Sequence, residues 1–325
     1  MGTQTGWSFC AWRVIYWRGR LGRGRRSQEE KGFSMSKGRA ALVELAEHYP
    51  QLYVAPADNE ETLAAYRLAC TRGVAPEGAN LDHFVTSEED ELRAIDTPAG
   101  DVETIFLKVR ADFETLLQVI GHKCSPVDIA PTIGAMTYRG MADWGAVRTA
   151  RLAYLAGGGD DWGAEFARLA KQPGAFRGEL IVISEGPYSS IAADETPYDE
   201  QEWIRVSREI RLNHECAHVV CRRKMPDDIL KIWDEVTADV VGLLCATGEY
   251  DAELAARFLG VTAKGYAEGR LIEYLDDEQK ARIDEVAVEV YGALREIESQ
   301  ARDKGAADAP FDYLLELKAQ PLVNY

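Results

Sequence analysis

The sequence predicts a mainly α-helical protein of the α+β class. Apolar residues recur at helical spacing through most of the chain. One short apolar run, residues 180–183, is bounded by Gly178 and by Gly186 and Pro187, which is typical of a β-strand. With 325 residues, of which 46% are hydrophobic and 28% charged, the chain has a globular composition and can bury a sizeable core.

The first half of the chain is expected to be helical. Asn59 and Gly73 are residue types that begin and end a helix, so they delimit one of these helices. The clearest apolar stripe runs through residues 101–123. The helices of this half are expected at residues 38–49, 59–73, 101–123, 142–156 and 161–172.

The second half is expected to hold the strand and the longer helices. After the strand, helical periodicity predicts helices over 198–224, 227–250, 276–303 and 309–319. We place a seam near residues 157–178, where a triple glycine interrupts the pattern. The chain would then consist of a tail at 1–34, a helical N-terminal region at 35–170 and a second domain at 171–325.

Residues 1–34 differ from the rest in charge. They carry seven Lys and Arg residues and two Glu, a net charge of +5. Because the whole chain has a net charge of −17, residues 35–325 carry −22. Their apolar part precedes the charges, the wrong order for a secretory signal. We interpret the segment as a disordered basic tail or as a mis-assigned start before Met35, with a membrane- or RNA-binding arm as the alternative.

Charge and cysteine usage restrict the function classes. A body of charge −22 repels phosphate backbones, so we expect no nucleic-acid partner. No apolar run approaches the roughly 20 residues that cross a bilayer, so we expect no membrane partner. The six cysteines form no C-x-x-C pair, and we expect reduced thiols in a cytoplasmic protein.

One stretch, RLNHECAHVV at residues 211–220, has the pattern of a metal site. Its H-E-x-x-H spacing places His214 and His218 on one face of a helix, where both imidazoles can bind one ion. Catalytic zinc takes three protein ligands and a water, and Glu215 can accept the proton of that water. Several intervening and flanking positions are uncharged, so two histidines without a metal would need other polar partners in a partly buried site. These positions are Leu212, Cys216, Ala217, Val219 and Val220.

A third ligand is expected on the following helix, because the remaining histidines all lie far upstream. Glu235 lies on that helix, and Asp239 follows one turn later on the same face. The short connection would make the two helices antiparallel. Counted at about 1.5 Å per residue, the depths of His218 and Glu235 along their helices then match to within about one turn.

The motif together with the following DEVTADVVG resembles the thermolysin-type metallopeptidases, the gluzincins, over about residues 211–242. The resemblance implies that His214, His218 and Glu235 bind one Zn²⁺ per chain, and that Asp239 hydrogen-bonds the far nitrogen of His214. It also implies a zincin-like metallohydrolase domain at 171–325, with a small sheet whose edge strand binds an extended peptide. The strand at 180–183 is either that edge strand or an ordinary core strand.

The implied activity is that of a zinc-dependent metallohydrolase, a peptidase acting on a peptide or protein substrate. Glu215 would be the general base and would pass its proton to the leaving amine. The chain departs from the gluzincin pattern because no histidine follows His218 to stabilise the oxyanion. Tyr266, Arg270 and Tyr274 are possible substitutes; alternatively, Arg270 forms a surface ion pair and Tyr274 belongs to the core.

Two other interpretations stay open. A catalytically inactive zincin-fold protein would keep the zinc and act as a binding or interaction module, which the absent downstream histidine favours. In a helical protein without a metal, His214 and Glu235 would merely hydrogen-bond to each other.

Overall fold

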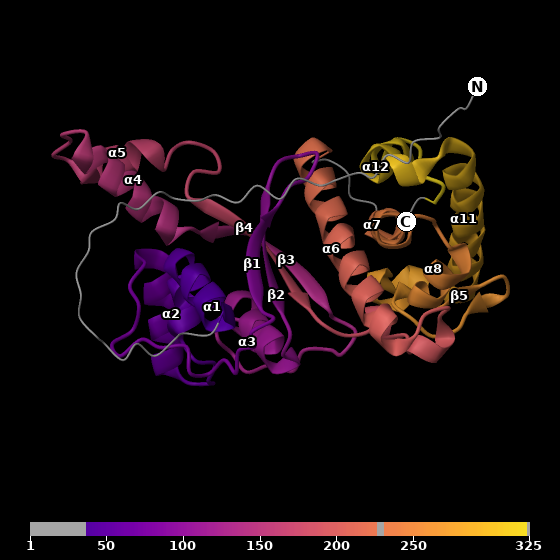
Figure 1. Ribbon diagram of the computed structural model, residues 1–325, viewed down its shortest axis with the longest axis horizontal. Coiled ribbons are helices and arrows are strands. Elements are labelled where there is room, and N and C mark those ends of the chain that lie inside the picture. The colour runs from indigo at the N-terminus through magenta and orange to yellow at the C-terminus, as the bar shows by residue number, and fades with distance from the viewer. Residues whose placement is uncertain (1–36, 226–230, 324–325) are drawn as a thin grey trace, which may run out of the picture. The chain divides into compact units, whose positions relative to one another are not determined.

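A four-stranded sheet with helices on both faces lies at the centre of the protein (Figure 1). The computed structural model describes residues 37–225 and 231–323, which belong to one compact unit. The strand order is β1-β2-β4-β3; β2 and β4 are parallel, and both outer strands are antiparallel to their neighbours. The strands are β1 (Glu91–Ile95), β2 (Val102–Leu107), β3 (Ala135–Ala142) and β4 (Arg177–Ser184).

Helices make up most of the described chain, which confirms the predicted mainly α (α+β) class. The helices that precede β4 are α1 (Lys37–His48), α2 (Glu60–Arg72), α3 (Arg110–Gly121), α4 (Trp144–Ala156) and α5 (Trp162–Leu169). Those that follow it are α6 (Glu200–Lys224), α7 (Lys231–Thr247), α8 (Ala252–Leu259), α9 (Leu271–Tyr274), α10 (Asp277–Lys280), α11 (Ile283–Lys304) and α12 (Pro310–Ala319). Short 3-10 helices lie at Pro50–Tyr53, Tyr188–Ser190, Ala193–Glu195 and Ala306–Asp308, and a small hairpin pairs β5 (Val261–Thr262) with β6 (Gly265–Tyr266).

The central strand β4 is buried on both faces and so separates two cores. Leu180 and Val182 belong to the core that α1 and α3 form on one face, whereas Ile181 and Ile183 belong to the core under α6 on the other. Successive side chains of a strand point to opposite faces, so an unbroken apolar run is what a strand in this position requires. This is why residues 180–183 are recognisable as a strand from sequence.

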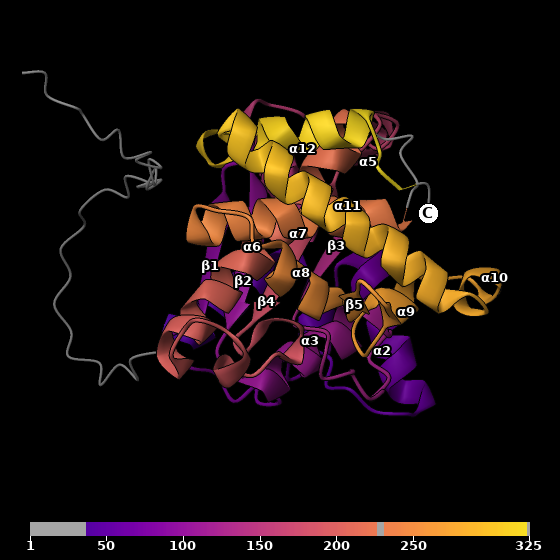
Figure 2. The ribbon, with the colours of Figure 1, turned by 90° about the vertical axis from the view of Figure 1, so that its right-hand side faces the viewer.

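Helices α6 and α7 pack along each other and run antiparallel, as expected. Ile210 of α6 lies against Gly242 of α7, and further along the pair His218 lies against Glu235. Helices α8, α11 and α12 cover the other sides of α7 (Figures 1 and 2). The first residues of the helix expected at 227–250 lie outside the described residues, which resume at Lys231.

Helix α2 begins after Asn59 and ends before Gly73, as the sequence predicts. The side chain of Asn59 accepts a hydrogen bond from the Thr62 backbone N–H at 2.8 Å, which caps α2. Gly73 ends the helix in the left-handed conformation, with φ at 66°. The single helix expected at 276–303 is instead divided into α10 and α11, because Arg282, at φ −128°, leaves the helical conformation between them.

The helix predicted at 101–123 is wrong in its first part. Val102–Leu107 is strand β2, and only Arg110–Gly121 is helical. Ile105 and Phe106 are neighbours that both fit a helical stripe, but they are buried on opposite faces of the sheet. A short apolar run is compatible with both periods, and the pairing of β2 with β1 and β4 decides for the strand.

The description of residues 35–170 as a helical region is therefore also wrong, because three of the four strands lie there. The seam expected near 157–178, and with it the boundary at 170, is crossed by the sheet, since β4 pairs with both β2 and β3. For the same reason β4 is not an edge strand. The strand at the edge next to it is β3. The tail at 1–34 lies outside the described residues.

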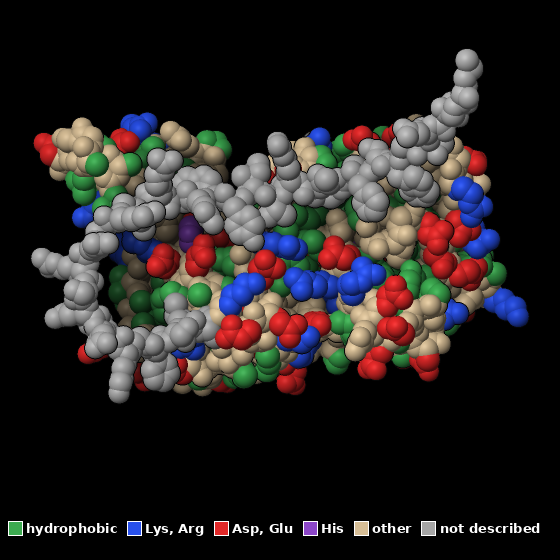
Figure 3. Space-filling model, viewed as in Figure 1, with side chains coloured by type: hydrophobic (Ala, Val, Ile, Leu, Met, Phe, Trp, Pro, Cys, Tyr) green, Lys and Arg blue, Asp and Glu red, His purple; other side chains and the backbone are tan. Residues whose placement is uncertain are grey.

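The surface mixes charges of both signs. Acidic and basic side chains both lie on the face shown in Figure 3, with a group of basic side chains near its middle and acidic ones around it. Among the described helices, none is both long and apolar enough to cross a membrane.

We predict that Gly242→Ala destabilises the fold by about 1–3 kcal/mol, because a Cβ there would overpack the contact between α6 and α7. It would lie 2.9 Å from the backbone oxygen of Ile210, which is too close without a shift of one helix. Urea unfolding followed by circular dichroism measures the change.

The matched control is Gly292→Ala in α11, where an added Cβ meets no atom within 4 Å. It should stabilise the protein by about 0.5–1 kcal/mol through helix propensity. Equal effects of the two substitutions would show that the close approach of α6 and α7 carries no energetic constraint.

Candidate metal centre

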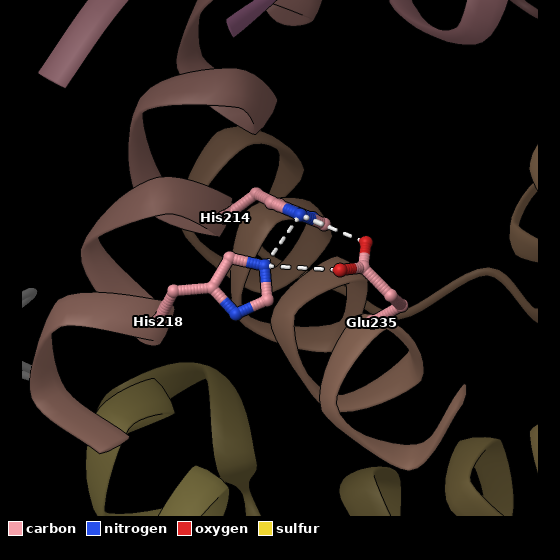
Figure 4. A group of neighbouring side chains, drawn as sticks. All are labelled: His214, His218 and Glu235. Atoms are coloured by element: carbon pink, nitrogen blue, oxygen red, sulfur yellow. Dashed lines mark hydrogen bonds and ion pairs between the residues drawn. The ribbon is translucent and has the colours of Figure 1, made fainter. Parts of the chain in front are cut away.

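Helices α6 and α7 bring together three side chains that can hold one metal ion (Figure 4). His214 and His218 come from adjacent turns of α6, and Glu235 comes from the first half of α7. One ligand atom of each lies within 4.8 Å of those of the other two. These are the three residues that the sequence indicates as ligands.

The separations of the three ligand atoms suit tetrahedral zinc. The two Nε2 atoms lie 3.0 Å apart, and the Glu235 oxygens lie 3.4 Å from His214 Nε2 and 3.5 Å from His218 Nε2. Ligands at about 2.0–2.1 Å from a tetrahedral ion stand about 3.3–3.4 Å from one another. Little movement of these side chains is needed to bind an ion between them.

The far nitrogens of both rings face carboxylates, which sets the tautomers. His214 Nδ1 lies 2.8 Å from Asp239 Oδ1, and His218 Nδ1 lies 3.3 Å from Asp234 Oδ2. Each Nδ1 therefore carries a proton, and the two Nε2 atoms face one another. In the metal-free protein a proton on His214 can lie between the two Nε2 atoms, and a bound metal ion would take the place of that proton.

The electrostatics of the site favour a positive charge. Burial lowers the pKa of His214, but Asp239 and Glu235 outweigh it and raise this pKa to about 10. Burial raises the pKa of Glu235, but the two histidines outweigh it and lower this pKa to about 2. The field that places a proton on His214 is the field that would attract a divalent cation.

The carboxylate of Asp239 is held from two further directions. The Tyr188 hydroxyl donates to Oδ1 at 2.6 Å and lies 3.0 Å from His214 Nδ1. Arg270 donates from Nη2 to Oδ2, also at 2.6 Å. Asp239 is buried, yet its pKa is lowered because Arg270 and its hydrogen bonds outweigh the cost of burial. The sequence indicates Asp239 but not Tyr188, which directly follows Gly186 and Pro187 beyond the end of β4.

Asp234 plays the matching part for His218, and the sequence does not single it out. Its Oδ1 accepts a hydrogen bond from Lys318 Nζ of α12 at 3.0 Å. The side chain of Lys318 is fully buried. His218 and Lys318 outweigh burial and lower the pKa of Asp234. The sequence does not indicate that Asp234 holds His218, because acidic residues are common in this chain. The role depends on Lys318 of α12, which is distant in sequence.

Glu215, the expected general base, lines the same cleft as the three candidate ligands. Its Oε2 accepts a 2.5 Å hydrogen bond from Thr137 Oγ1, a residue of the edge strand β3. The cleft has a volume of about 450 Å³ and lies between α6 and the segment from Thr132 to Thr137. Thr137 was not identified from sequence, because β3 itself was not predicted.

Arg270 and Tyr274 line the cleft as well. Arg270 is neither exposed nor a surface ion pair; it is held between Asp239 and the Tyr274 hydroxyl, which lies 3.4 Å from Nη1. Burial raises the pKa of Tyr274, so its hydroxyl stays protonated. Tyr266 does not line this cleft, and its hydroxyl hydrogen-bonds the backbone of Gly269.

Comparison with known protein families assigns the chain to a family. The model of a family of unknown function (DUF7005) matches residues 30–310, which is most of the sequence. The chain belongs to the DUF7005 family. The matched range includes both α6 and α7, so the candidate metal centre lies within the DUF7005 region. No curated protein and no solved structure matches the chain.

We predict that the metal-free protein loses stability as the pH rises from about 6.5 towards 10. The pKa of His214 in the fold, about 10, lies above its ordinary 6.5. Protonated His214 therefore stabilises the fold fully below pH 6.5, and this contribution disappears as the pH rises through 10. Urea unfolding of chelator-treated protein at pH 6.5, 7.5, 8.5 and 9 measures it, and Asp239→Asn should flatten the decline. A flat profile in the native protein would contradict the prediction.

Proposed function

We propose that this protein is a zinc-dependent metallohydrolase that cleaves peptide bonds. The observation that carries the proposal is the pair of Nε2 atoms turned towards one another beside Glu235, with both Nδ1 atoms held by carboxylates. His214, His218 and Glu235 would hold the zinc ion. The resemblance of this segment to the gluzincins supports the same donor set.

Glu215 supplies the base in this proposal. A bound zinc ion would lower the pKa of water and polarise the carbonyl of the substrate. Glu215 takes the proton of the attacking water and delivers it to the nitrogen of the leaving amine. Thr137 fixes the carboxylate by donating to Oε2, so that Oε1 is the oxygen that exchanges the proton.

The edge strand β3 suits an extended peptide as the substrate. The Gly134 carbonyl accepts a hydrogen bond from the Ser184 N–H at 2.9 Å, and Ala135 pairs with Ile183. Backbone groups of an antiparallel strand face its neighbour at alternate residues, so those of Ala135 and Thr137 point away from β4. Both residues line the cleft, and a peptide adding to this edge would pass the metal centre.

Tyr274 is the proposed donor to the negative charge that develops on the carbonyl oxygen. Its hydroxyl remains protonated and lies at the cleft beside Arg270. Arg270 is engaged with Asp239 through Nη2, so it supports Tyr274 and the ligand network rather than acting alone.

A second candidate function is zinc-dependent binding without turnover. The observation in its favour is that all five histidines of the sequence lie at or before residue 218. No histidine is therefore left to assist the oxyanion, and the zinc site would serve to hold α6 against α7. Activity separates the two candidates, whereas zinc content supports both.

We predict about one zinc ion per chain in the native protein and a strong loss of zinc in Glu235→Ala, because one of three ligands is removed. Elemental analysis of protein reconstituted with zinc and then desalted measures both. Glu273→Ala is the matched control, because Glu273 is an acidic residue of the same cleft outside the ligand group, and it should retain the metal. An absence of zinc from the native protein would rule out both candidate functions.

We predict that Glu215→Gln keeps the zinc and lowers peptide hydrolysis by about 10²- to 10⁴-fold, the contribution of a general base. Mass spectrometry of a mixed peptide library measures cleavage, and elemental analysis of the same sample measures zinc. Loss of the metal together with the activity would contradict the role assigned to Glu215. Equal inactivity of native and variant protein, both loaded with zinc, would favour the binding function.

A further inference from the structure

Arg211 lies on the same face of α6 as the candidate ligands and lines the cleft. Its side chain is almost fully buried, with 5% of the residue exposed. His214 follows three residues later, about 4.5 Å further along the helix axis. A group bound by Arg211 would therefore lie beside the metal centre, towards the N-terminal end of α6.

Arg211 differs from the other two arginines of the cleft in having no acidic partner. Arg222 pairs with Glu179 at 3.3 Å, and Arg270 pairs with Asp239 at 2.6 Å. Among residues 37–225 and 231–323, no carboxylate forms an ion pair with Arg211, and burial lowers its pKa to about 10. Burying a cation without a counter-charge costs folding free energy. Lys318, the other buried lysine or arginine among the residues described, pairs with Asp234.

Two hydrogen bonds hold the Arg211 guanidinium in place and leave some of its N–H donors available. Nη1 donates to the Gly186 carbonyl and Nη2 to the Pro187 carbonyl, each at 2.6 Å. A guanidinium has five N–H donors, so donors remain beyond these two bonds. Gly134, just before β3, leaves room for the group, because a Cβ there would lie 2.2 Å from Arg211 Nε. The charge is thus fixed at the end of the edge strand.

We propose that Arg211 binds a carboxylate of the substrate, so that the cleft selects acidic peptides. The inference rests on the proposed hydrolase function, because it deepens the specificity of that site. A peptide advances about 3.3 Å per residue along a strand, so the carboxylate would belong to a residue about one or two positions from the cleaved bond. An acidic side chain and a free C-terminus offer the same chemistry, a planar carboxylate that matches a guanidinium.

The test compares two hydroxamates on the zinc-loaded protein by calorimetry. Succinic monohydroxamate carries a carboxylate, and butanohydroxamate carries a methyl group in its place. We expect the carboxylate to bind about ten-fold more tightly, which corresponds to about 1.4 kcal/mol. Equal affinities in the native protein would overturn the proposal, and this comparison does not depend on any variant folding.

Variants and longer ligands sharpen the result. Arg211→Met should remove the preference, whereas Arg208→Met should keep it, because Arg208 lies one turn earlier on α6, pairs with Glu91 and is outside the cleft. Loss of the preference in both variants would overturn the proposal. Peptidyl hydroxamates that end in aspartyl amide or in alanine with a free carboxylate then distinguish the side chain from the C-terminus.

A measurement without metal separates failure of this inference from failure of the proposed function. Succinate titrated into metal-free protein with ¹⁵N-labelled arginine should shift the Arg211 Nε resonance, which Arg211→Lys identifies by its absence. No shift would overturn the carboxylate site whatever the zinc content. A shift in a protein that binds neither zinc nor hydroxamates would leave the anion site standing and refute the hydrolase.

Discussion

Helices α6 and α7 approach so closely that a side chain at Gly242 would touch the backbone of Ile210. This approach places the carboxylates of α7 within reach of both rings of α6, where they hold the two Nδ1 protons and leave the Nε2 atoms facing. The tautomers, the spacing of the ligand atoms and the attraction for a cation all follow from that one contact between helices. The sheet, on the opposite side of α6, contributes the wall of the cleft.

The two histidines of the centre have the same kind of surroundings. Each histidine contacts a carboxylate, and each carboxylate contacts a buried cationic side chain. Asp239 lies between His214 and Arg270, and Asp234 lies between a histidine and Lys318. A carboxylate shared in this way stays ionised and keeps its direction. The two cations come from α12 and from just before α9, so the helices around α7 stabilise the site as well as the core.

The sequence predicts the local part of this arrangement and misses the non-local part. His214 and His218 follow from helical spacing, and Glu235 and Asp239 follow from the next helix, because short-range geometry decides both. Thr137 and Tyr188 approach from the sheet and from the turn after β4, and no local pattern reports such contacts. The sequence does not distinguish strand β2 from a helix, because its apolar residues fit both periods and only pairing with neighbouring strands decides between them.

The burial of Lys318 has a consequence for the order of events in the cell. This lysine lies 84 residues after Asp234 and belongs to the last helix described. Until that helix has left the ribosome, Asp234 lacks its cation and His218 lacks a carboxylate held in place. Synthesis of the H-E-x-x-H motif therefore precedes completion of the Lys318–Asp234 ion pair by many residues.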